Sequence, residues 1–168
     1  MTAESNQTDL EAFAEGLAKG ARLLGVDLGE KTIGLALSDV GRSIATPLET
    51  IRRTKFTPDA ERIRALASRF EVGGIVIGLP LNMDGSEGPR AQATRAFARN
   101  LKALLGLPVV FWDERLSTAA VTRTLLSADA SRAKRSQVVD KMAAAYILQG
   151  ALDRLWRALP DPDGDGAA

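Results

Sequence analysis

Three carboxylates that are far apart in the sequence have the surroundings that phosphate chemistry needs. Asp27 lies inside the mostly apolar, strand-like run 22–28, where an ionised acid is costly unless a cation offsets its desolvation. Glu114 follows another apolar run, and Asp140 opens the expected final helix. If the three converge, hard cations such as Mg²⁺ or Mn²⁺ would relieve their mutual repulsion. In such a site one ion activates a water molecule and the other stabilises the leaving oxygen.

Each acid also has an ordinary structural explanation. Asp27 could be a turn residue that accepts hydrogen bonds from nearby amides, and Asp140 could be a helix-capping acid. Glu114 could be a surface acid paired with Arg115, which would contribute little. Asp113 could be the ligand in place of Glu114, because adjacent strand residues point to opposite faces and the sequence fixes no register. The hypothesis of a metal site therefore depends on the three acids as a set.

The composition excludes several kinds of chemistry. The chain has 168 residues, with no histidine and no cysteine. Serine and cysteine hydrolase triads usually need an imidazole base, and zinc sites usually need imidazole or thiolate ligands. An enzyme of this composition must work through carboxylates, hydroxyls and amines. No apolar run reaches membrane-spanning length and no targeting segment is evident, so we expect a cytoplasmic protein without a membrane partner.

The apolar pattern predicts three hairpin-linked strands followed by strands that alternate with helices. Short connections make the first three strands antiparallel, and helical crossovers make the later strands parallel to the first. This order is similar to the ribonuclease H-like fold, an α/β fold whose five-stranded mixed sheet is flanked by helices. The expected strands are 22–28, 32–39, 44–51, 75–77 and 108–112, and the expected helices run from Thr57 to the Gly73–Gly74 pair, over 89–105, from Ser117 to about Ser127 and over 137–159.

The chain divides into one main domain with two acidic ends. Residues 1–20 are expected to be an N-terminal extension with a short amphipathic helix, an appendage to the domain. Residues 21–159 form the single ribonuclease H-like domain, and residues 160–168 read as a disordered acidic tail. Within the domain, 129–136 is expected to be irregular. Strands one and five should end at the same edge of the sheet, where the start of the last helix brings Asp140 to Asp27 and Glu114.

Basic and polar residues around this edge are candidates for contacts to a nucleic acid. Cationic side chains neutralise phosphates and give affinity that is largely independent of sequence. Aromatic residues make up only 5% of the chain, so we expect recognition of backbone and shape rather than base stacking. A solvated charged loop or an ordinary tight turn would use the same residue types. The candidates are Lys31, Asn82, Arg90, Arg115, Arg132, Lys134, Arg135 and Lys141.

Four motifs give the chain a resemblance to a known family. The segments 25–34, 76–85, 113–118 and 139–149, in this order, resemble the YqgF family, also called RuvX. The resemblance spans about residues 21–155. It implies a ribonuclease H-like fold and a metal-dependent nuclease, described either as a Holliday junction resolvase or as a nuclease that matures the 5′ end of pre-16S rRNA in ribosome biogenesis. The expected partner is therefore structured RNA or branched DNA.

The resemblance also implies roles for individual residues. The acidic positions of the family fall on Asp27, Glu114 and Asp140 as catalytic residues and ligands of Mg²⁺ or Mn²⁺. Related resolvases carry a second acid one turn further along the final helix, where this chain has Ala143 and Ala144. Two ions are expected, the second bound only with substrate. A junction resolvase would need two active sites and hence a homodimer, whereas an RNA-processing enzyme could act as a monomer.

Two other functions compete with the nuclease. The segment 27–31 resembles the phosphate loop of actin-like ATPases and sugar kinases, but those proteins close two such domains around a nucleotide and this chain has room for one. A non-catalytic nucleic-acid-binding module on the same fold is the second competitor. Three acids where phosphates dock argue against it, because a pure binder gains nothing from them.

Overall fold

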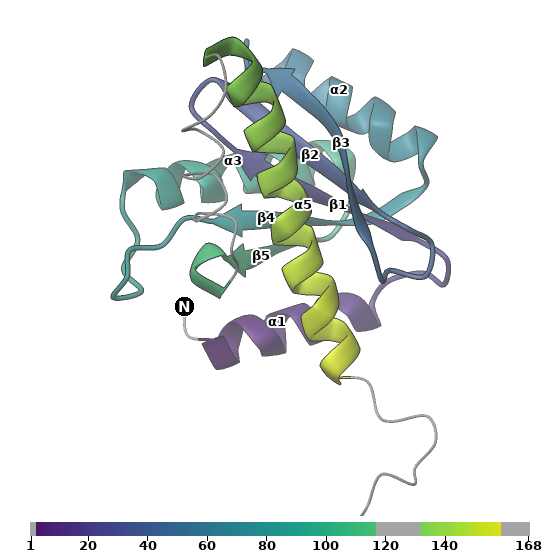
Figure 1. Cartoon of the computed structure of the whole chain (residues 1–168). Coiled ribbons are helices and arrows are strands. Elements are labelled where there is room, and N and C mark those ends of the chain that lie inside the picture. The colour runs from purple at the N-terminus through teal and green to yellow at the C-terminus, as the bar shows by residue number, and fades with distance from the viewer. Residues whose placement is uncertain (1–2, 117–131, 159–168) are drawn as a thin grey trace, which may run out of the picture.

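Five strands form one mixed sheet in the spatial order β3-β2-β1-β4-β5 (Figure 1). β1 pairs with β2 in antiparallel and with β4 in parallel fashion, β2 and β3 are antiparallel, and β4 and β5 are parallel. The predicted mixed sheet with a central first strand is confirmed. In this computed structural model, which describes residues 3–116 and 132–158, the strands are β1 Arg22–Leu28, β2 Thr32–Ser38, β3 Ala45–Arg52, β4 Val72–Leu79 and β5 Val109–Asp113.

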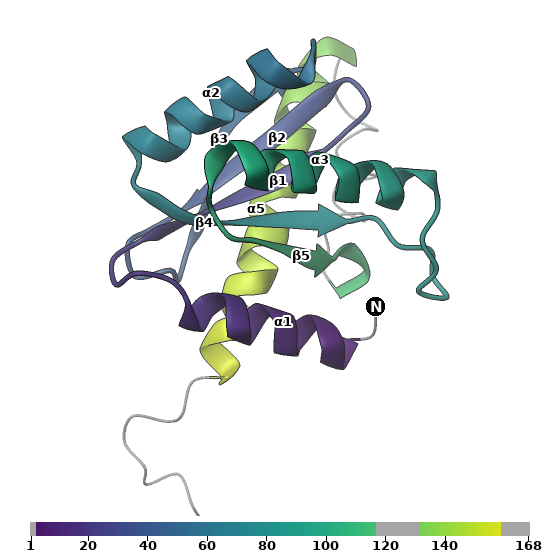
Figure 2. The same ribbon diagram turned by 180° about the vertical axis from the view of Figure 1, so that it is seen from behind.

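Helices cover both faces of the sheet. α2 and α3 lie on one face, and α5 crosses the other face diagonally, with α1 beside it (Figures 1 and 2). None of the described helices is both long and apolar enough to cross a membrane. The helices are α1 Ala3–Glu15, α2 Phe56–Arg69, α3 Pro89–Leu105 and α5 Arg132–Ala158, with a short 3₁₀ turn, η1, at Glu114–Leu116.

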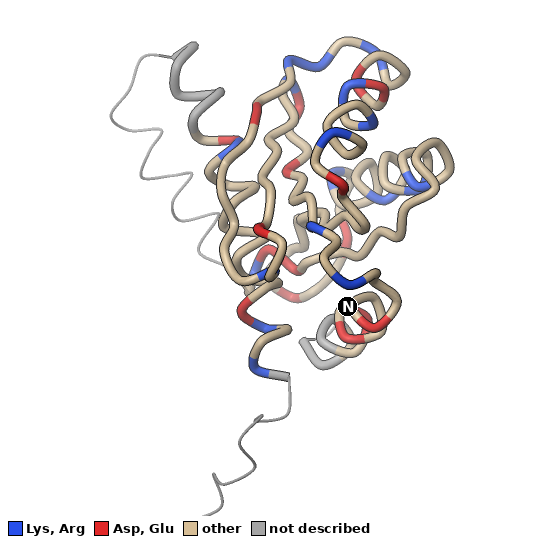
Figure 3. Tube along the Cα trace, turned by 90° about the vertical axis from the view of Figure 1, so that its right-hand side faces the viewer, with Lys and Arg blue, Asp and Glu red and all other residues tan. Residues whose placement is uncertain are grey.

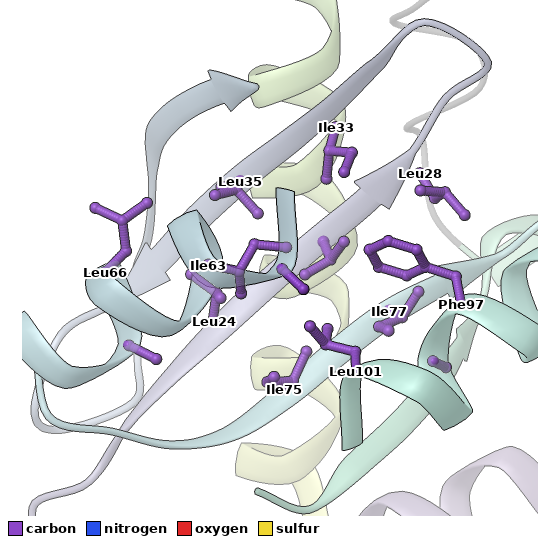
Figure 4. Packing of buried hydrophobic residues seen from close by; sticks show 14 of the residues in the cluster. Leu24, Leu28, Ile33, Leu35, Ile63, Leu66, Ile75, Ile77, Phe97 and Leu101 are labelled. Carbon is purple, nitrogen blue, oxygen red and sulfur yellow. The ribbon is translucent and has the colours of Figure 1, made fainter. Parts of the chain in front are cut away.

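Alternating side chains divide the core into two clusters. Leu24, Val26 and Leu28 of β1 pack with α2 and α3, and Figure 4 shows Ile63 and Phe97 of these helices against the strands. Leu23 belongs to the second cluster, which α1 and α5 complete. Because successive strand residues point to opposite faces, Asp27 lies on the α5 side of the sheet.

The Gly73–Gly74 pair does not end a helix, contrary to the sequence prediction. α2 ends at Arg69 and the chain turns through Glu71, whose φ is 55°, so both glycines lie inside β4. They are needed there because neighbours occupy the space of a Cβ. A Cβ on Gly73 would overlap Ala21, and one on Gly74 would lie 2.8 Å from Leu17 in the segment after α1.

The N-terminal segment is packed into the domain rather than appended to it. Leu10 is fully buried and Phe13 nearly so, both within the cluster that α1 shares with α5. An amphipathic helix is present, as expected, but its apolar face covers the end of the sheet near β5. The predicted helix at 117–127, the segment 129–131 and the acidic tail 160–168 lie outside the described residues.

The final helix begins earlier than the sequence indicated. Residues 132–136, expected to be irregular, are part of α5, which starts at Arg132 instead of Gln137. By contrast, α3 has the predicted bounds: Pro89 begins it and Gly106, with a φ of 68°, ends it. Proline in the first turn marks the start of a helix and a left-handed glycine after the last turn marks its end. The first turn of α5 has no proline, so the sequence gives no such signal for its start.

Candidate active site

Asp27 is a buried acid on the central strand, directly opposite a glycine. It is only 2% exposed, and its partner in the β1–β2 ladder is Gly34. Two further glycines on this face, Gly25 of β1 and Gly78 of β4, lie against α5: a Cβ on Gly25 would be 2.8 Å from Leu148. The sheet therefore has a nearly bare strip around Asp27, and α5 packs close to the strands along it.

Asp140 reaches Asp27 through this close packing. A Cβ on Gly34 would overlap the backbone carbonyl of Asp140, and it would be 2.9 Å from the amide nitrogen of Lys141. The Thr32 hydroxyl at the start of β2 donates a hydrogen bond to the Asp140 carboxylate. Thr32 is not among the residues that the sequence predicts for the site, because nothing in the sequence indicates which strand end faces the helix.

Asp140 does not open the final helix, contrary to the sequence prediction. α5 begins at Arg132, so Asp140 lies in the interior of the helix and its amide is not among the unpaired amides of the first turn. The helix dipole therefore gives it little help, because that effect fades after the first turn. Its position is set instead by the contact with Gly34 and by the bond from Thr32.

Asp27 and Asp140 line one hollow at the end of the sheet. The hollow has a volume of about 280 Å³, and a cationic side chain, Arg90 at the start of α3, lines it as well. The chain thus brings together two of the three predicted acids and one predicted phosphate contact. The remaining lining residues are Gly29 and Glu30, in the turn between β1 and β2.

Glu114 lies on the same face of the sheet but does not line this hollow. Its Oε1 atom is 2.7 Å from the place where a Cβ on Gly78 would be, beside Ile147 of α5. Gly78 is on β4, which pairs with the strand of Asp27, so Glu114 extends from η1 after β5 over this neighbouring strand. Within residues 3–116 and 132–158, no three acidic side chains are close enough to form a metal-binding group.

The donor set nevertheless suits a hard divalent cation. Asp27 and Asp140 offer carboxylate oxygens in a shared hollow, which are the ligands that Mg²⁺ and Mn²⁺ prefer. Histidine and cysteine, which would favour softer metals, are absent from the chain. The residues present therefore fit an oxygen-ligated metal, with Glu114 adjacent.

Asp113, the alternative to Glu114, has a structural partner. It is fully buried and forms an ion pair with Arg115, whose Nη2 donates to Oδ2 at 2.6 Å. This bond is the main reason why the pKa of Arg115 is raised. Arg115 also donates to the Met83 carbonyl at 3.2 Å, so it ties β5 to the loop after β4. Arg115 thus forms its ion pair with Asp113, whereas the sequence suggested Glu114 as its partner. Its side chain stabilises the contact between the end of β5 and the loop after β4.

The loop between β4 and α3 is held by its own hydrogen bonds. Asn82, a predicted phosphate contact, donates from Nδ2 to the Ser86 hydroxyl at 2.9 Å. Ser86 in turn donates to Asp84 from its amide at 2.9 Å and from its hydroxyl at 2.6 Å. These bonds, the hydroxyl first, lower the pKa of Asp84. Asn82 therefore has a role in shaping the loop.

The other predicted phosphate contacts differ in their exposure and in how far the structure describes them. Lys31 is exposed in the β1–β2 turn, where its carbonyl accepts a hydrogen bond from the Arg53 amide at 2.8 Å. Lys141 is half-buried next to Asp140. The positively charged trio Arg132, Lys134 and Arg135 lies in the first turn of α5, but the positions of these side chains fall outside the described part of the structure.

Comparisons with known proteins agree with this site and fold. The RuvX family model, described as Holliday junction resolvase, matches residues 21–154. A relative from Beijerinckia indica is 73% identical over 134 residues, covering 80% of this chain and 81% of the relative. A relative from Methylocella silvestris is 69% identical over 140 residues, covering 83% and 87%. Both carry the name "Putative pre-16S rRNA nuclease".

A solved structure supports the fold. RuvC from T. thermophilus, in complex with a Holliday junction substrate, has a TM-score of 0.51 to this chain at 16% identity, covering 84% of this chain and 99% of RuvC. The sheet order, the buried Asp27 and the family match over most of the domain agree with one another. The resemblance inferred from the four sequence motifs is confirmed: the chain belongs to the RuvX family.

Proposed function

We propose that this nuclease uses divalent metal ions to hydrolyse phosphodiester bonds in structured nucleic acid, and that its substrate is the 5′ end of pre-16S rRNA. The observation that carries the proposal is the hollow that the buried Asp27 shares with Asp140 and Arg90. A carboxylate pair without a cation is costly at a buried position, so the hollow favours a bound metal ion. The single arginine favours an anion, such as a phosphate, next to that metal.

Asp27 and Asp140 would hold the first ion, and Glu114 is the third acid of the site. Thr32 keeps the Asp140 carboxylate in place through its hydroxyl bond. Bound there, a divalent cation supplies Lewis-acid chemistry to the scissile phosphate. Since α5 has alanines where a further acid could stand, substrate phosphate would complete the ligands of a second ion.

Arg90 and Lys31 would bind the phosphates on either side of the cut. Arg90 enters the hollow from α3, and Lys31 is exposed in the turn beside it. Phosphate contacts of this kind position the backbone without reading sequence. Recognition would therefore depend on the shape of the folded nucleic acid.

The names of the relatives favour ribosomal RNA, and the family description keeps junction DNA as the second substrate to test. Both substrates present the same phosphates to the acids. They differ in symmetry: a four-way junction is cut at two points, so a resolvase would act as a homodimer. Sedimentation of the chain with and without junction DNA measures whether it forms the dimer that a resolvase needs, and a chain that stays monomeric on the junction argues against resolution.

The decisive experiment incubates the purified full chain with pre-16S rRNA and with a four-way DNA junction, with Mg²⁺, with Mn²⁺ and with EDTA. We expect metal-dependent cleavage of the RNA, and Asp27→Asn, Asp140→Asn and Glu114→Gln each lower its rate by about two orders of magnitude or more. Glu61→Gln, an exposed acid on α2 across the sheet, is the matched control and keeps the rate.

Other outcomes would overturn the proposal. Binding without cleavage under every metal condition would indicate a non-catalytic module. Wild-type activity of Asp27→Asn would remove the acid on which the site depends. Tight binding of ATP by the isolated chain would indicate the actin-like alternative.

A further inference from the structure

A second hollow lies on the opposite face of the sheet from α5, between α3 and the edge strand β5. Its volume is about 350 Å³, and it is distinct from the hollow that holds Asp27. We call it the α3–β5 groove. It is lined by Arg95, Ala98, Arg99, Lys102, Val109 and Phe111.

The groove is strongly basic because of the sequence of α3. This helix carries arginine or lysine at 90, 95, 99 and 102 and has no acidic residue. The last three are spaced i, i+4 and i+7, which places them on one face of a helix. Figure 3 shows lysine and arginine along this helix. A row of like charges on one face is unfavourable unless an anion neutralises it.

Arg95 forms a fixed wall of the groove. Its guanidinium lies 4.9 Å from the centre of the Phe111 ring, and its Nε donates to Glu87. Arg99 and Lys102 are different: both are exposed, and within the described residues neither has an acidic partner. Two cations thus remain available to a ligand beside an arginine that is held in place.

The groove and the candidate active site are connected by one helix. α3 begins with Arg90 in the first hollow and continues to Lys102 in the groove. At 1.5 Å per residue the two side chains are about 18 Å apart along the helix axis. This length corresponds to about five base pairs of a B-form DNA duplex, at 3.4 Å per base pair, and to about six of an A-form RNA duplex, whose rise is smaller.

The chemistry of the groove favours a duplex over a single strand. Single strands bind chiefly by stacking their bases on aromatic rings, and the ring in this groove is Phe111, whose face is covered by Arg95. Exposed cations a turn apart suit successive phosphates of a backbone instead. An acidic protein would meet the same charges, but the helix leads from the groove directly to the site of cleavage.

We propose that the α3–β5 groove binds the sugar–phosphate backbone of a duplex arm of the substrate, about five to six base pairs from the phosphate that is cut. The inference rests on the proposed nuclease function, because it places the substrate between the two hollows. Arg99 and Lys102 make the phosphate contacts, and Arg95 shapes the wall.

The test measures binding in EDTA, so that it does not depend on cleavage. Wild type and Arg99→Ala/Lys102→Ala are titrated against a long-stemmed RNA hairpin and against the same hairpin truncated to about four base pairs beyond the cut position. Lys19→Ala/Arg157→Ala is the matched control, since it removes two exposed cations that do not line the groove. Circular dichroism verifies that all variants fold.

We expect the double variant to lower the slope of log Kobs against log salt by about two for the long stem and by clearly less for the truncated stem. The control keeps the wild-type slope on both. An unchanged slope, or an equal loss in the control, overturns the proposal that the groove binds a duplex arm. Metal-dependent cleavage with an unchanged slope refutes only the proposal that the groove binds a duplex arm. A lowered slope without any cleavage refutes only the proposed nuclease activity.

Discussion

Asp27 and Gly34 are paired across the β1–β2 ladder, and the missing side chain of Gly34 is what allows Asp140 to lie beside Asp27. The backbone of α5 occupies the space of a Cβ at this position. The candidate site thus depends on a residue that has no functional group. Its two acids come from a strand and a helix that are more than a hundred residues apart, and the glycine sets the distance between them.

Gly34→Ala should therefore damage both stability and activity. The added methyl group would overlap the Asp140 carbonyl, so α5 must move away from β2. Overpacking of this kind costs about 1–3 kcal/mol. Urea denaturation measures this loss, and a cleavage assay at a temperature where the variant is folded measures the displacement of Asp140.

Gly16→Ala is the control for that substitution. A Cβ at Gly16 would meet its nearest atom, the Phe13 carbonyl oxygen, at an ordinary 3.7 Å. We expect near wild-type stability and activity. If both alanine variants behave alike, close packing of α5 on β2 is not what positions Asp140.

Thr32→Val should weaken the site without unfolding the protein. Valine keeps the β-branched shape that suits a strand but cannot donate to the Asp140 carboxylate. Loss of a partner that orients a metal ligand typically costs tenfold or more in metal affinity or activity, so we expect a metal requirement raised by about tenfold. Metal titrations of the cleavage rate measure it.

Two further variants make this prediction specific. Thr32→Ser restores the hydroxyl and should recover most of the metal affinity. Thr46→Val, an exposed threonine on β3, should have no effect. Failure of serine to rescue would show that the valine acts through packing rather than through the lost hydrogen bond.

The elements with strong local signals could be predicted from the sequence. Pro89 and Gly106 mark both ends of α3, and the apolar run of β1 gives its bounds. The prediction that the Gly73–Gly74 pair ends a helix is wrong, because glycine also occurs in a strand where another chain segment comes close. Ala21 and Leu17 take the space there, and only the tertiary fold shows this.

The candidate site was predictable in its residue types more than in its geometry. The order of the predicted strands and helices places Asp27 and Asp140 at the same edge of the sheet, and the two residues do line one hollow. It placed Asp140 at a helix start, whereas the helix continues back to Arg132. It could not choose between Asp113 and Glu114, since that choice depends on which face of β5 packs on α5. Val110 and Trp112 lie in the cluster with α5, and strand alternation then directs Asp113 to the other side.

The loop after β4 should respond to acid through Asp84. Hydrogen bonds from the Ser86 hydroxyl and amide lower the pKa of Asp84 in the folded protein. A lowered pKa means that these bonds stabilise the loop above the ordinary pKa and are lost as the pH falls through the lowered one. Ser86→Ala removes the largest cause, so the pKa of Asp84 should rise towards its ordinary value in a carboxyl NMR titration.

Asp39 provides an internal control for that titration. Its pKa is lowered chiefly by the backbone amides of Ile44 and Ser43, and the Ser43 hydroxyl contributes less. Ser43→Ala should therefore shift the pKa of Asp39 less than Ser86→Ala shifts that of Asp84. A larger shift at Asp39 would contradict the assigned causes.

Asp113 and Glu114 are neighbours in sequence but should differ in what their substitution costs. Asp113 is fully buried and accepts hydrogen bonds from the amide, Nε and Nη2 of Arg115. Asp113→Ala removes the acceptor of these three donors, so it should lower the free energy of unfolding by about 2–3 kcal/mol. Asp113→Asn keeps an acceptor for the Arg115 amide and should cost less, and it should still cleave with metal. Glu114→Gln should show the reverse, near-normal stability in denaturation and lost cleavage. If Asp113→Asn abolished metal-dependent cleavage while Glu114→Gln kept it, Asp113 would be the ligand and the ion pair with Arg115 would have to open on metal binding.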